Sequence, residues 1–191
     1  VAAGDDTIFA FRGATNNFWR YSISQNQWFS ADSAPATTAL GSSLVYDGQG
    51  GIFAARGGAT SREFWRYDIA TDEWSHAQAN PVTPAASAPT MVRADASTYY
   101  AFPNGGTNVF YRYSTITDSW DGMAPAPGNI TSGCAMVTVG DTIYVFQGTS
   151  KNFWRYNRVD NVWTTAAPTP AAIGLGASMV CPGGDLIYAT R

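Results

Sequence analysis

Histidine and cysteine, which supply many catalytic and metal-binding groups, are scarce in this chain. Its 191 residues include two cysteines, Cys134 and Cys181, and a single histidine, His76. One histidine cannot build a two-histidine copper site or a zinc site with three or four ligands. Two cysteines are too few for a disulfide scaffold, and whether they bridge stays open, with buried free thiols favoured. We therefore expect no catalytic residue, no metal and no cofactor.

Charge and long apolar runs are also lacking. Charged residues make up 13% of the chain, and its net charge of −3 is spread without a basic run. This pattern gives no electrostatic footprint for nucleic acid or for an anionic membrane. No apolar stretch reaches the roughly 18–20 residues that span a bilayer, so we expect no membrane insertion. Arginine far outnumbers lysine, and the connectors are rich in Thr, Ser, Ala and Pro, which is typical of an extracellular or cell-surface protein.

One aromatic motif is present in four copies. Phe-Trp-Arg-Tyr occupies residues 18–21, 64–67 and 153–156, and Phe-Tyr-Arg-Tyr occupies residues 110–113. A tryptophan follows seven residues after the tyrosine of each copy. Self-similarity at a period of about 45 residues is the signature of a repeat architecture. The recurring aromatic and arginine residues, expected to be structural, are Trp19, Arg20, Tyr21, Trp28, Trp65, Arg66, Tyr67, Trp74, Arg112, Tyr113, Trp120, Trp154, Arg155, Tyr156 and Trp163.

Four short β-rich segments recur in each unit and predict an all-β fold. The copies of an opening strand of β-forming residues are 7–11, 51–55, 98–102, 142–146 and 186–190. A turn-forming loop leads to the Phe-Trp-Arg-Tyr strand, and the constant spacing to the next tryptophan makes the following strand its hairpin partner. Proline-rich connectors then lead to a small-residue strand, whose copies are 41–45, 88–92, 133–137 and 176–180.

We expect residues 1–191 to form a single repetitive body of four-stranded antiparallel blades. The repeat units span about 6–48, 49–95, 96–140 and 141–184, with a surplus strand at 185–191. Side chains alternate across a strand, so Phe18 and Arg20 point to one face and Trp19 and Tyr21 to the other. Both faces carry large apolar groups, and stacked blades would cover both.

The pattern resembles the kelch repeat of β-propellers over the whole chain. The resemblance rests on the tyrosine of the Phe-Trp-Arg-Tyr strand, the tryptophan at constant spacing, the valine of the small-residue strand and the glycine after the opening strand. The family's glycine pair is changed here to Arg12-Gly13, Arg56-Gly57, Pro103-Asn104 and Gln147-Gly148. The arginine and histidine often found before the small-residue strand are absent. The resemblance implies a divergent, tryptophan-rich kelch-type propeller.

The strand count leaves one strand over. There are five copies of the opening strand and four of each other strand, while residues 1–5 match the exit from a small-residue strand. The chain is part of a longer array of about six to eight blades, or two chains share one ring, or the last strand is donated to a neighbour. A closed four-bladed ring with a loose last strand is the fourth account. Under strand donation, removal of residues 185–191 should leave folded monomers, whereas an intact mass well above 20.4 kDa would indicate the longer array.

The arginines of the Phe-Trp-Arg-Tyr strands are candidates for binding carboxylates, sulfates or sugars. A structural role is favoured, and the residues two positions further along are Ser22, Asp68, Ser114 and Asn157 rather than four acids. We therefore expect backbone carbonyls as the regular partners of these arginines. The seven tryptophans are expected to pack between blades rather than to stack on sugars.

Loop residues that differ between units are better candidates for a ligand or partner site. The loops after the opening strands and the proline-rich connectors share one face of a blade, and loops on rigid scaffolds often carry function. A merely solvated loop face is the simpler interpretation. The rim residues are Arg12, Asn16, Asn17, Arg62, Glu63, Asn104, Asn108, Lys151 and Asn152.

The acidic residues and a sequon offer weaker signals. Carboxylates recur in two kinds of tight turn, and turn formation explains both sets. The turns before the opening strands contain Asp6, Asp141 and Asp185, and the turns before the second tryptophan contain Asp72, Asp118 and Asp160. Asn129-Ile130-Thr131 is an N-glycosylation sequon, so Asn129 is a candidate for glycosylation, and the connectors could accept O-linked sugars outside the cell.

These observations favour a non-enzymatic extracellular structural or interaction propeller that binds a protein partner or itself. Self-assembly into a larger ring or a filament would use the terminal strand. A carbohydrate-binding, lectin-like propeller is the alternative. The propeller part of a glycosidase or oxidase comes third, because no carboxylate pair is indicated.

Overall fold

The chain folds into short antiparallel strands joined by turns. Four four-stranded sheets and one two-stranded sheet account for β1 to β18, and the part of the chain that the structure describes contains no helix. This confirms the predicted all-β fold of four blades. The computed structural model describes residues 1–39, 41–58, 62–79, 89–102, 105–184 and 186–190.

Each four-stranded sheet is one blade, and its strands pair in chain order. Blade 1 contains β1 (Ala2–Ala3), β2 (Thr7–Phe11), β3 (Phe18–Ser22) and β4 (Gln27–Ser30). Blade 2 contains β5 (Ser43–Tyr46), β6 (Gly51–Ala55), β7 (Phe64–Asp68) and β8 (Glu73–His76). Blade 3 contains β9 (Thr90–Arg93), β10 (Thr98–Phe102), β11 (Phe110–Ser114) and β12 (Ser119–Met123). Blade 4 contains β13 (Ala135–Val139), β14 (Thr142–Phe146), β15 (Phe153–Asn157) and β16 (Val162–Thr165).

The N-terminal residues form a strand that is not among the four small-residue strands counted in the sequence. Ala2 lies opposite Ile8 and Ala3 opposite Thr7, so β1 is the small-residue strand of blade 1. At the other end, β17 (Ser178–Val180) pairs with β18 (Tyr188–Thr190). The last strand is therefore paired within the chain. Each sheet begins with its small-residue strand, one strand earlier than the repeat units read from the sequence.

The third and fourth strands of every blade meet in one register. Tyr21 lies opposite Trp28, and each later tyrosine of the motif lies opposite the tryptophan seven residues on. The residue before each fourth strand has a positive φ, which aspartate and asparagine tolerate better than most residues. These residues are Asn26 at 51°, Asp72 at 57°, Asp118 at 45° and Asn161 at 55°.

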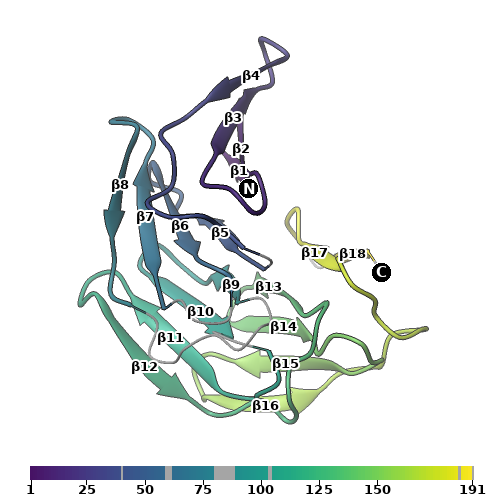
Figure 1. Cartoon of the computed structure of the whole chain (residues 1–191). Coiled ribbons are helices and arrows are strands. Elements are labelled where there is room, and N and C mark those ends of the chain that lie inside the picture. The colour runs from purple at the N-terminus through teal and green to yellow at the C-terminus, as the bar shows by residue number, and fades with distance from the viewer. Residues whose placement is uncertain (40, 59–61, 80–88, 103–104, 185, 191) are drawn as a thin grey trace.

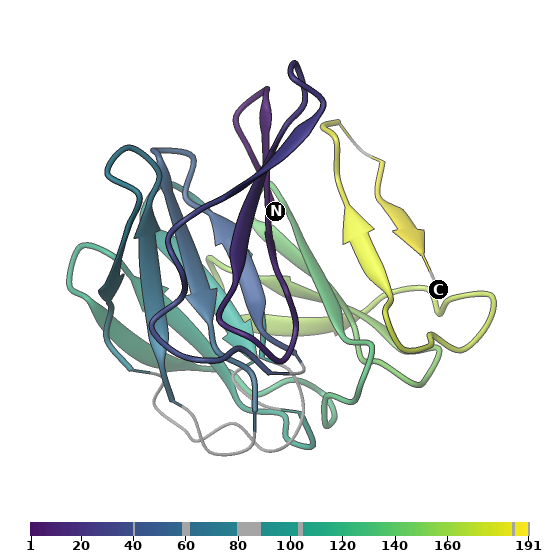
Figure 2. The ribbon, with the colours of Figure 1, turned by 45° about the horizontal axis from the view of Figure 1, so that its top comes forward.

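The blades fan around a common axis with their first strands innermost (Figure 1), where β9 contacts β5 and β13, and β13 contacts β17. Blade 1 and the hairpin of β17 and β18 stand at the two ends of this fan, on either side of its open sector (Figures 1 and 2). In the described chain, the blades in the middle of the fan therefore have a neighbour on each face, whereas the two ends of the fan have a neighbour on one face.

Candidate functional site

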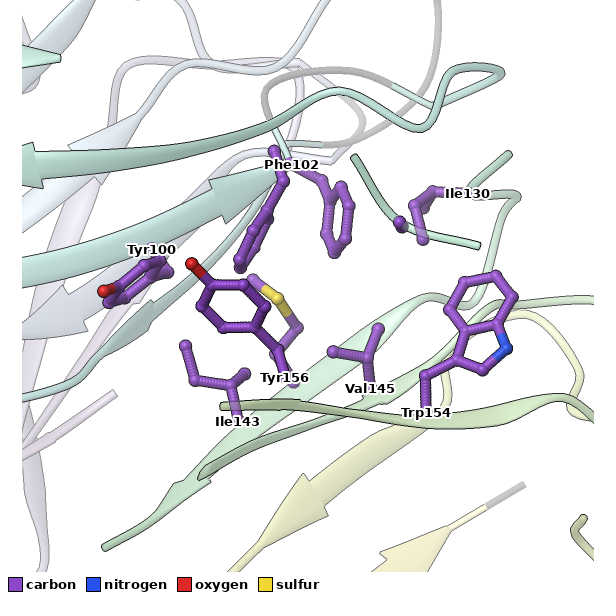
Figure 3. Close-up of a cluster of buried hydrophobic side chains, with 10 residues drawn as sticks. Tyr100, Phe102, Ile130, Ile143, Val145, Trp154 and Tyr156 are labelled. Carbon is purple, nitrogen blue, oxygen red and sulfur yellow. The ribbon is translucent and has the colours of Figure 1, made fainter. Parts of the chain in front are cut away.

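The Phe-Trp-Arg-Tyr strands build the interfaces between blades, as their alternation predicts. The rings of Phe9 and Phe18 in blade 1 lie 5.6 and 5.0 Å from the ring of Tyr67 in blade 2. The same contact recurs between blades 3 and 4, where Tyr156 faces Tyr100 at 5.6 Å (Figure 3). Both faces of the middle blades are covered in this way, which confirms the expected stacking.

A tryptophan and a turn residue of one blade hold the backbone of a single residue in the preceding blade. Nε1 of Trp74 donates to the carbonyl oxygen of Asp32 at 2.9 Å, and the amide of Asp32 donates to Oδ1 of Asp72 at 2.8 Å. We call this pair of hydrogen bonds the backbone clasp. Two further clasps hold Gln78, through Trp120 at 3.0 Å and Asp118 at 2.9 Å, and Ala124, through Trp163 at 2.8 Å and Asn161 at 2.9 Å.

The motif tyrosine fixes the turn residue of each clasp. The hydroxyl of Tyr67 donates to Oδ1 of Asp72 at 2.5 Å, and the hydroxyl of Tyr113 donates to Oδ1 of Asp118 at 2.5 Å. Burial, reinforced by the hydrogen bond to the carboxylate, raises the pKa of both tyrosines far above its ordinary value. The phenols therefore stay protonated and keep donating. The clasp is preorganised by its own blade.

Blade 1 has the same groups, but no preceding blade covers them. Ile8 is 37% exposed, whereas Ile52 and Ile143 at the same place in their strands are fully buried. Trp28 is 53% exposed. Trp28 lines an open hollow of about 430 Å³ together with Ala10, Trp19 and Phe29. We call Ile8, Trp19, Tyr21, Asn26 and Trp28 the uncovered face of blade 1.

The hairpin at the other end of the fan also carries exposed apolar side chains. Val180, Leu186 and Tyr188 are all more than half exposed. Tyr188 occupies the place in its strand that Phe9 and Tyr100 occupy in theirs, where the aromatic ring packs on the following blade. We call Val180, Leu186 and Tyr188 the hairpin face.

The motif arginines have partners that differ from blade to blade. The prediction that backbone carbonyls are their regular partners is wrong. Their observed partners are Asp47 and Asp68 for Arg66, at 3.1 and 3.2 Å, Asp121 for Arg112, at 2.8 Å, and the ring of Phe29 for Arg20, at 5.1 Å from the guanidinium carbon to the ring centroid. Arg155 is exposed. Asp121 and Phe29 lie opposite their arginines across the hairpin. Since each partner differs, the arginines do not form a ring of equivalent binding groups.

The main chain of several predicted rim residues holds the connector of the same blade. The carbonyl of Asn16 accepts from the amide of Ala34 at 2.9 Å, and the carbonyl of Asn108 accepts from the amide of Ala126 at 2.9 Å. The carbonyl of Lys151 accepts in the same way from Thr169, at 3.0 Å. The loops and connectors are therefore brought together, in an arrangement that serves the blade itself.

The side chains of the rim residues are occupied to different degrees. Glu63 forms an ion pair with Arg56, and Nδ2 of Asn152 donates to Oε1 of Gln147 at 2.7 Å. Asn17 accepts the amide of Arg12 through its carbonyl at 3.1 Å. Arg12, Asn16, Arg62 and Lys151 are exposed, and Asn104 lies outside the described residues. None of the hollows of about 300, 430, 580 and 910 Å³ in the described part of the chain is lined by a rim residue.

A polar hollow of about 300 Å³ lies between blades 2 and 3, lined in part by Asp47, Arg66, His76 and Tyr99. Tyr99 stands where other blades have isoleucine, and its buried hydroxyl meets no hydrogen-bond partner among the described residues. His76 is the exposed last residue of β8. Within the described ranges, no three His, Cys, Asp or Glu residues gather to hold a metal. A polar hollow of this size suits ordered water.

The residues that lead into the first strands surround a third hollow, of about 910 Å³, near the axis of the fan. Small and hydroxyl-bearing residues line it, including Ser42, Thr90, Ser132 and Cys134. Burial raises the pKa of the Cys134 thiol to about 12. Both Cys134 and Cys181 are free thiols, so they do not bridge each other.

The glycosylation candidate is accessible. Asn129 is exposed, while the next residue, Ile130, is buried and the hydroxyl of Thr131 contacts that of Thr149 at 2.9 Å. No described residue belongs to a helix long and apolar enough to cross a membrane.

The backbone clasp was not predicted from the sequence. Its turn residues are aspartate or asparagine five residues after the motif tyrosine and two before the tryptophan, in all four units. We interpreted the acidic ones only as turn formers and placed Asp160 among them, whereas the structure uses Asn161. A comparison of the four copies position by position would have revealed this signal.

Comparison with known proteins finds a likeness in structure rather than in sequence. No family model matches the chain, and no curated protein matches its sequence. The solved structure titled "Structure of YjhT" is similar, with a TM-score of 0.74 and 14% sequence identity. The match covers 93% of this chain and 67% of that chain. The likeness and the arrangement of its sheets together show that the chain has a β-propeller fold.

Proposed function

We propose that the chain is a non-enzymatic structural and interaction module, built as a kelch-type propeller, that binds proteins of its own kind through the two ends of the fan. The observation that carries the proposal is the exposure of Ile8 and Trp28, whose counterparts in the middle blades pack against a neighbour. Contiguous exposed apolar groups mark interaction surfaces in soluble proteins. The scarcity of histidine and cysteine supports the non-enzymatic part.

A second copy of the chain is the partner that these faces fit best. Within the chain, the aromatic ring in the middle of the second strand packs on the following blade, as Phe53 does on Tyr99 with ring centroids 4.9 Å apart. Tyr188 is exposed at the matching place in the hairpin, and Ile8 is exposed at the place of Tyr99 in blade 1. A contact between Tyr188 of one copy and Ile8 of the next would repeat the internal interface head to tail.

The molar mass in solution tests this function. Light scattering over increasing protein concentration should give a mass that rises above the 20.4 kDa of one chain. The variants Tyr188→Glu and Ile8→Glu should each remain monomeric, because a buried unpaired carboxylate opposes the contact. Val159→Glu, at an exposed turn of blade 4, is the matched control and should assemble like the wild type. A wild-type mass that stays at one chain at every concentration would refute the assembly.

Carbohydrate binding is the second candidate. The hollow beside Trp19, Trp28 and Phe29 is open and aromatic, and aromatic rings of this kind stack on the faces of sugars. A glycan array, followed by titration with the intrinsic tryptophan fluorescence as readout, tests it. No binding at millimolar sugar would exclude this role. The extracellular location stays a prediction and fits either function.

A further inference from the structure

The uncovered face of blade 1 carries a copy of the backbone clasp that no described residue fills, which we call the empty clasp. Its two hydrogen-bonding atoms are Nε1 of Trp28 and Oδ1 of Asn26, and the hydroxyl of Tyr21 donates to that same Oδ1 at 2.6 Å. The rings of Tyr21 and Trp28 are 5.1 Å apart, against 5.0 Å for Tyr67 and Trp74 in a filled clasp. The empty clasp therefore has the geometry of the filled ones.

The filled clasps define what can occupy the empty one. Each holds one residue through its amide and its carbonyl, and the three held residues are Asp32, Gln78 and Ala124. These residues share no side-chain chemistry, so the clasp recognises main chain. Proline cannot occupy it, because proline has no N–H to donate.

A small side chain two residues further along provides the second anchor. Ala34, two residues after Asp32, is buried in a cluster with Trp65 and Ala54. Ala126, two residues after Ala124, is buried in the cluster that contains Trp154. A proline follows each of these two alanines. In blade 1, Ala10 and Trp19 stand at the places of Ala54 and Trp65 and line the open hollow.

We propose that the uncovered face of blade 1 is a docking site for an extended polypeptide segment in which a non-proline residue is followed two positions later by alanine and then proline. The clasp holds the first residue, and the hollow beside Trp19 receives the alanine. This inference rests on the proposed function, because both assign protein binding to blade 1. It uses the clasp rather than Ile8, so the two contacts can be removed separately.

A peptide titration tests the docking site. The probe is a synthetic peptide with the sequence of residues 30–37, Ser-Ala-Asp-Ser-Ala-Pro-Ala-Thr, added to ¹⁵N-labelled full-length protein. The indole N–H resonance of Trp28, assigned from a Trp28→Phe variant, should shift saturably with a Kd on the order of 1 mM. The same peptide N-methylated at its single aspartate lacks the donated N–H and should bind roughly three- to tenfold more weakly, about the effect of one net hydrogen bond.

Variants of the turn residue distinguish binding through the clasp from nonspecific binding of the peptide. Asn26→Asp should bind the peptide like the wild type, since Asp72 and Asp118 do the same task in the filled clasps. Asn26→Gly keeps the left-handed backbone but removes Oδ1, and should lose about as much affinity as peptide methylation. Equal binding of the two peptides, equal binding to Asn26→Gly, or no shift of Trp28 at 10 mM peptide, about ten times the expected Kd, would each overturn the proposal.

The peptide result can be told apart from a failure of self-assembly. Tyr188→Glu should abolish the rise in mass and leave peptide binding unchanged. Asn26→Gly should weaken peptide binding and leave the rise in mass unchanged, because the assembly contact uses Tyr188 and Ile8 and not the side chain of Asn26. If Asn26→Gly affected both measurements equally, the peptide site and the assembly contact would be one surface and the proposal would fail.

Discussion

At the scale of single residues, the backbone clasp gives the repeated tryptophans unequal energetic roles. Trp74 and Trp28 occupy the same position in successive units, yet only Nε1 of Trp74 donates to a backbone carbonyl of the described chain. A net hydrogen bond stabilises a protein by about 0.5–1.5 kcal/mol. The contribution of each indole therefore depends on whether its blade has a predecessor.

Trp74→Phe should lower the free energy of unfolding by about 1 kcal/mol beyond the effect of Trp28→Phe. Both substitutions remove an indole N–H and keep an aromatic ring, so the difference contains the bond to Asp32 and the packing of the Trp74 ring on Phe11 and Phe18. Urea denaturation followed by circular dichroism measures both values. Equal destabilisation by the two variants would show that the clasp adds nothing to stability.

The carboxylate of Asp6 gives a pH-dependent contribution to stability. The amide of Ser24, and the hydroxyls of Ser22 and Ser24, donate to this carboxylate and lower its pKa below the ordinary value of 3.8. A carboxylate with a lowered folded-state pKa stabilises the fold above its unfolded pKa, and this stabilisation is lost as the pH falls through the folded value.

Between about pH 4 and pH 2, the urea midpoint of the wild type should therefore fall more steeply than that of Asp6→Asn. Above about pH 5 the two slopes should be parallel, because Asp6 is ionised in both the folded and unfolded wild type. An identical acid dependence of the two proteins would exclude this role of Asp6.

Cys134 is predicted to be chemically inert in the folded protein. Burial raises its pKa to about 12, so only about one thiol in ten thousand is ionised at pH 8, and the thiolate is the reactive form. Iodoacetamide should alkylate Cys134 slowly in the native protein and rapidly in urea, as measured by peptide mass spectrometry. Rapid native alkylation would contradict the raised pKa of this thiol.

At the scale of strands and turns, the entry into the first strand of blade 4 depends on the absence of a side chain. Gly133 has a φ of 85°, and a Cβ there would collide with the carbonyl oxygen of Gly174. Gly176 begins the next first strand with a similar φ of 78°, but open space surrounds the position of its Cβ. The two glycines share a conformational requirement and differ in packing.

Gly176→Ala should cost about 1 kcal/mol of backbone strain. Gly133→Ala should cost about 2 kcal/mol more, because the backbone of residue 174 must move. Thermal unfolding of the two variants gives the comparison. Similar losses of stability in the two variants would mean that the backbone around residue 174 can move without an energetic penalty.

Strands and their order could be predicted from the sequence because the repeat imposes them four times. The spacing from Tyr21 to Trp28 fixes a hairpin register, and the alternation of Trp19 with Arg20 fixes which side chains face each neighbour. Residues 1–5 match the exit from a small-residue strand, but the pairing of Ala2–Ala3 as a strand of blade 1 could not be predicted because a strand this short has no period of its own.

The arginine partners and the clasps could not be predicted by the same reasoning. Asp121 lies opposite Arg112 across a hairpin, and Asp47 contacts Arg66 from the turn after β5, so neither is a fixed neighbour along the chain. The clasp joins Asp32 to Trp74 across 42 residues. Such contacts depend on how blades stack, which a pattern within one unit does not contain.

At the scale of the whole molecule, the first strands of blades 2, 3 and 4 contact their neighbours in chain order, as in other repeat proteins. Blade 2 packs against blade 1 through Tyr67 and against blade 3 through Phe64. In blade 1, Trp19 and Trp28 face an open hollow. Local stability should therefore be lowest in blade 1 and highest in blades 2 and 3.

Hydrogen exchange measured by mass spectrometry should show this gradient. Backbone amides of residues 18–22 should exchange at least about tenfold faster than those of residues 64–68 and 110–114, although the strands have nearly the same sequence. Assembly of the protein should protect the first segment selectively. Uniform exchange across the three segments would indicate that the blades unfold as one unit.

The main-chain character of the clasp has a consequence for how such a protein can change over time. Since the held residue is aspartate, glutamine or alanine, neighbouring blades need not adjust their sequences to each other. A duplicated blade would find the same contacts wherever it was inserted, provided that no proline fell on the held position. Gain or loss of a whole unit is therefore tolerated at the joints between blades, and the number of units is free to vary among descendants.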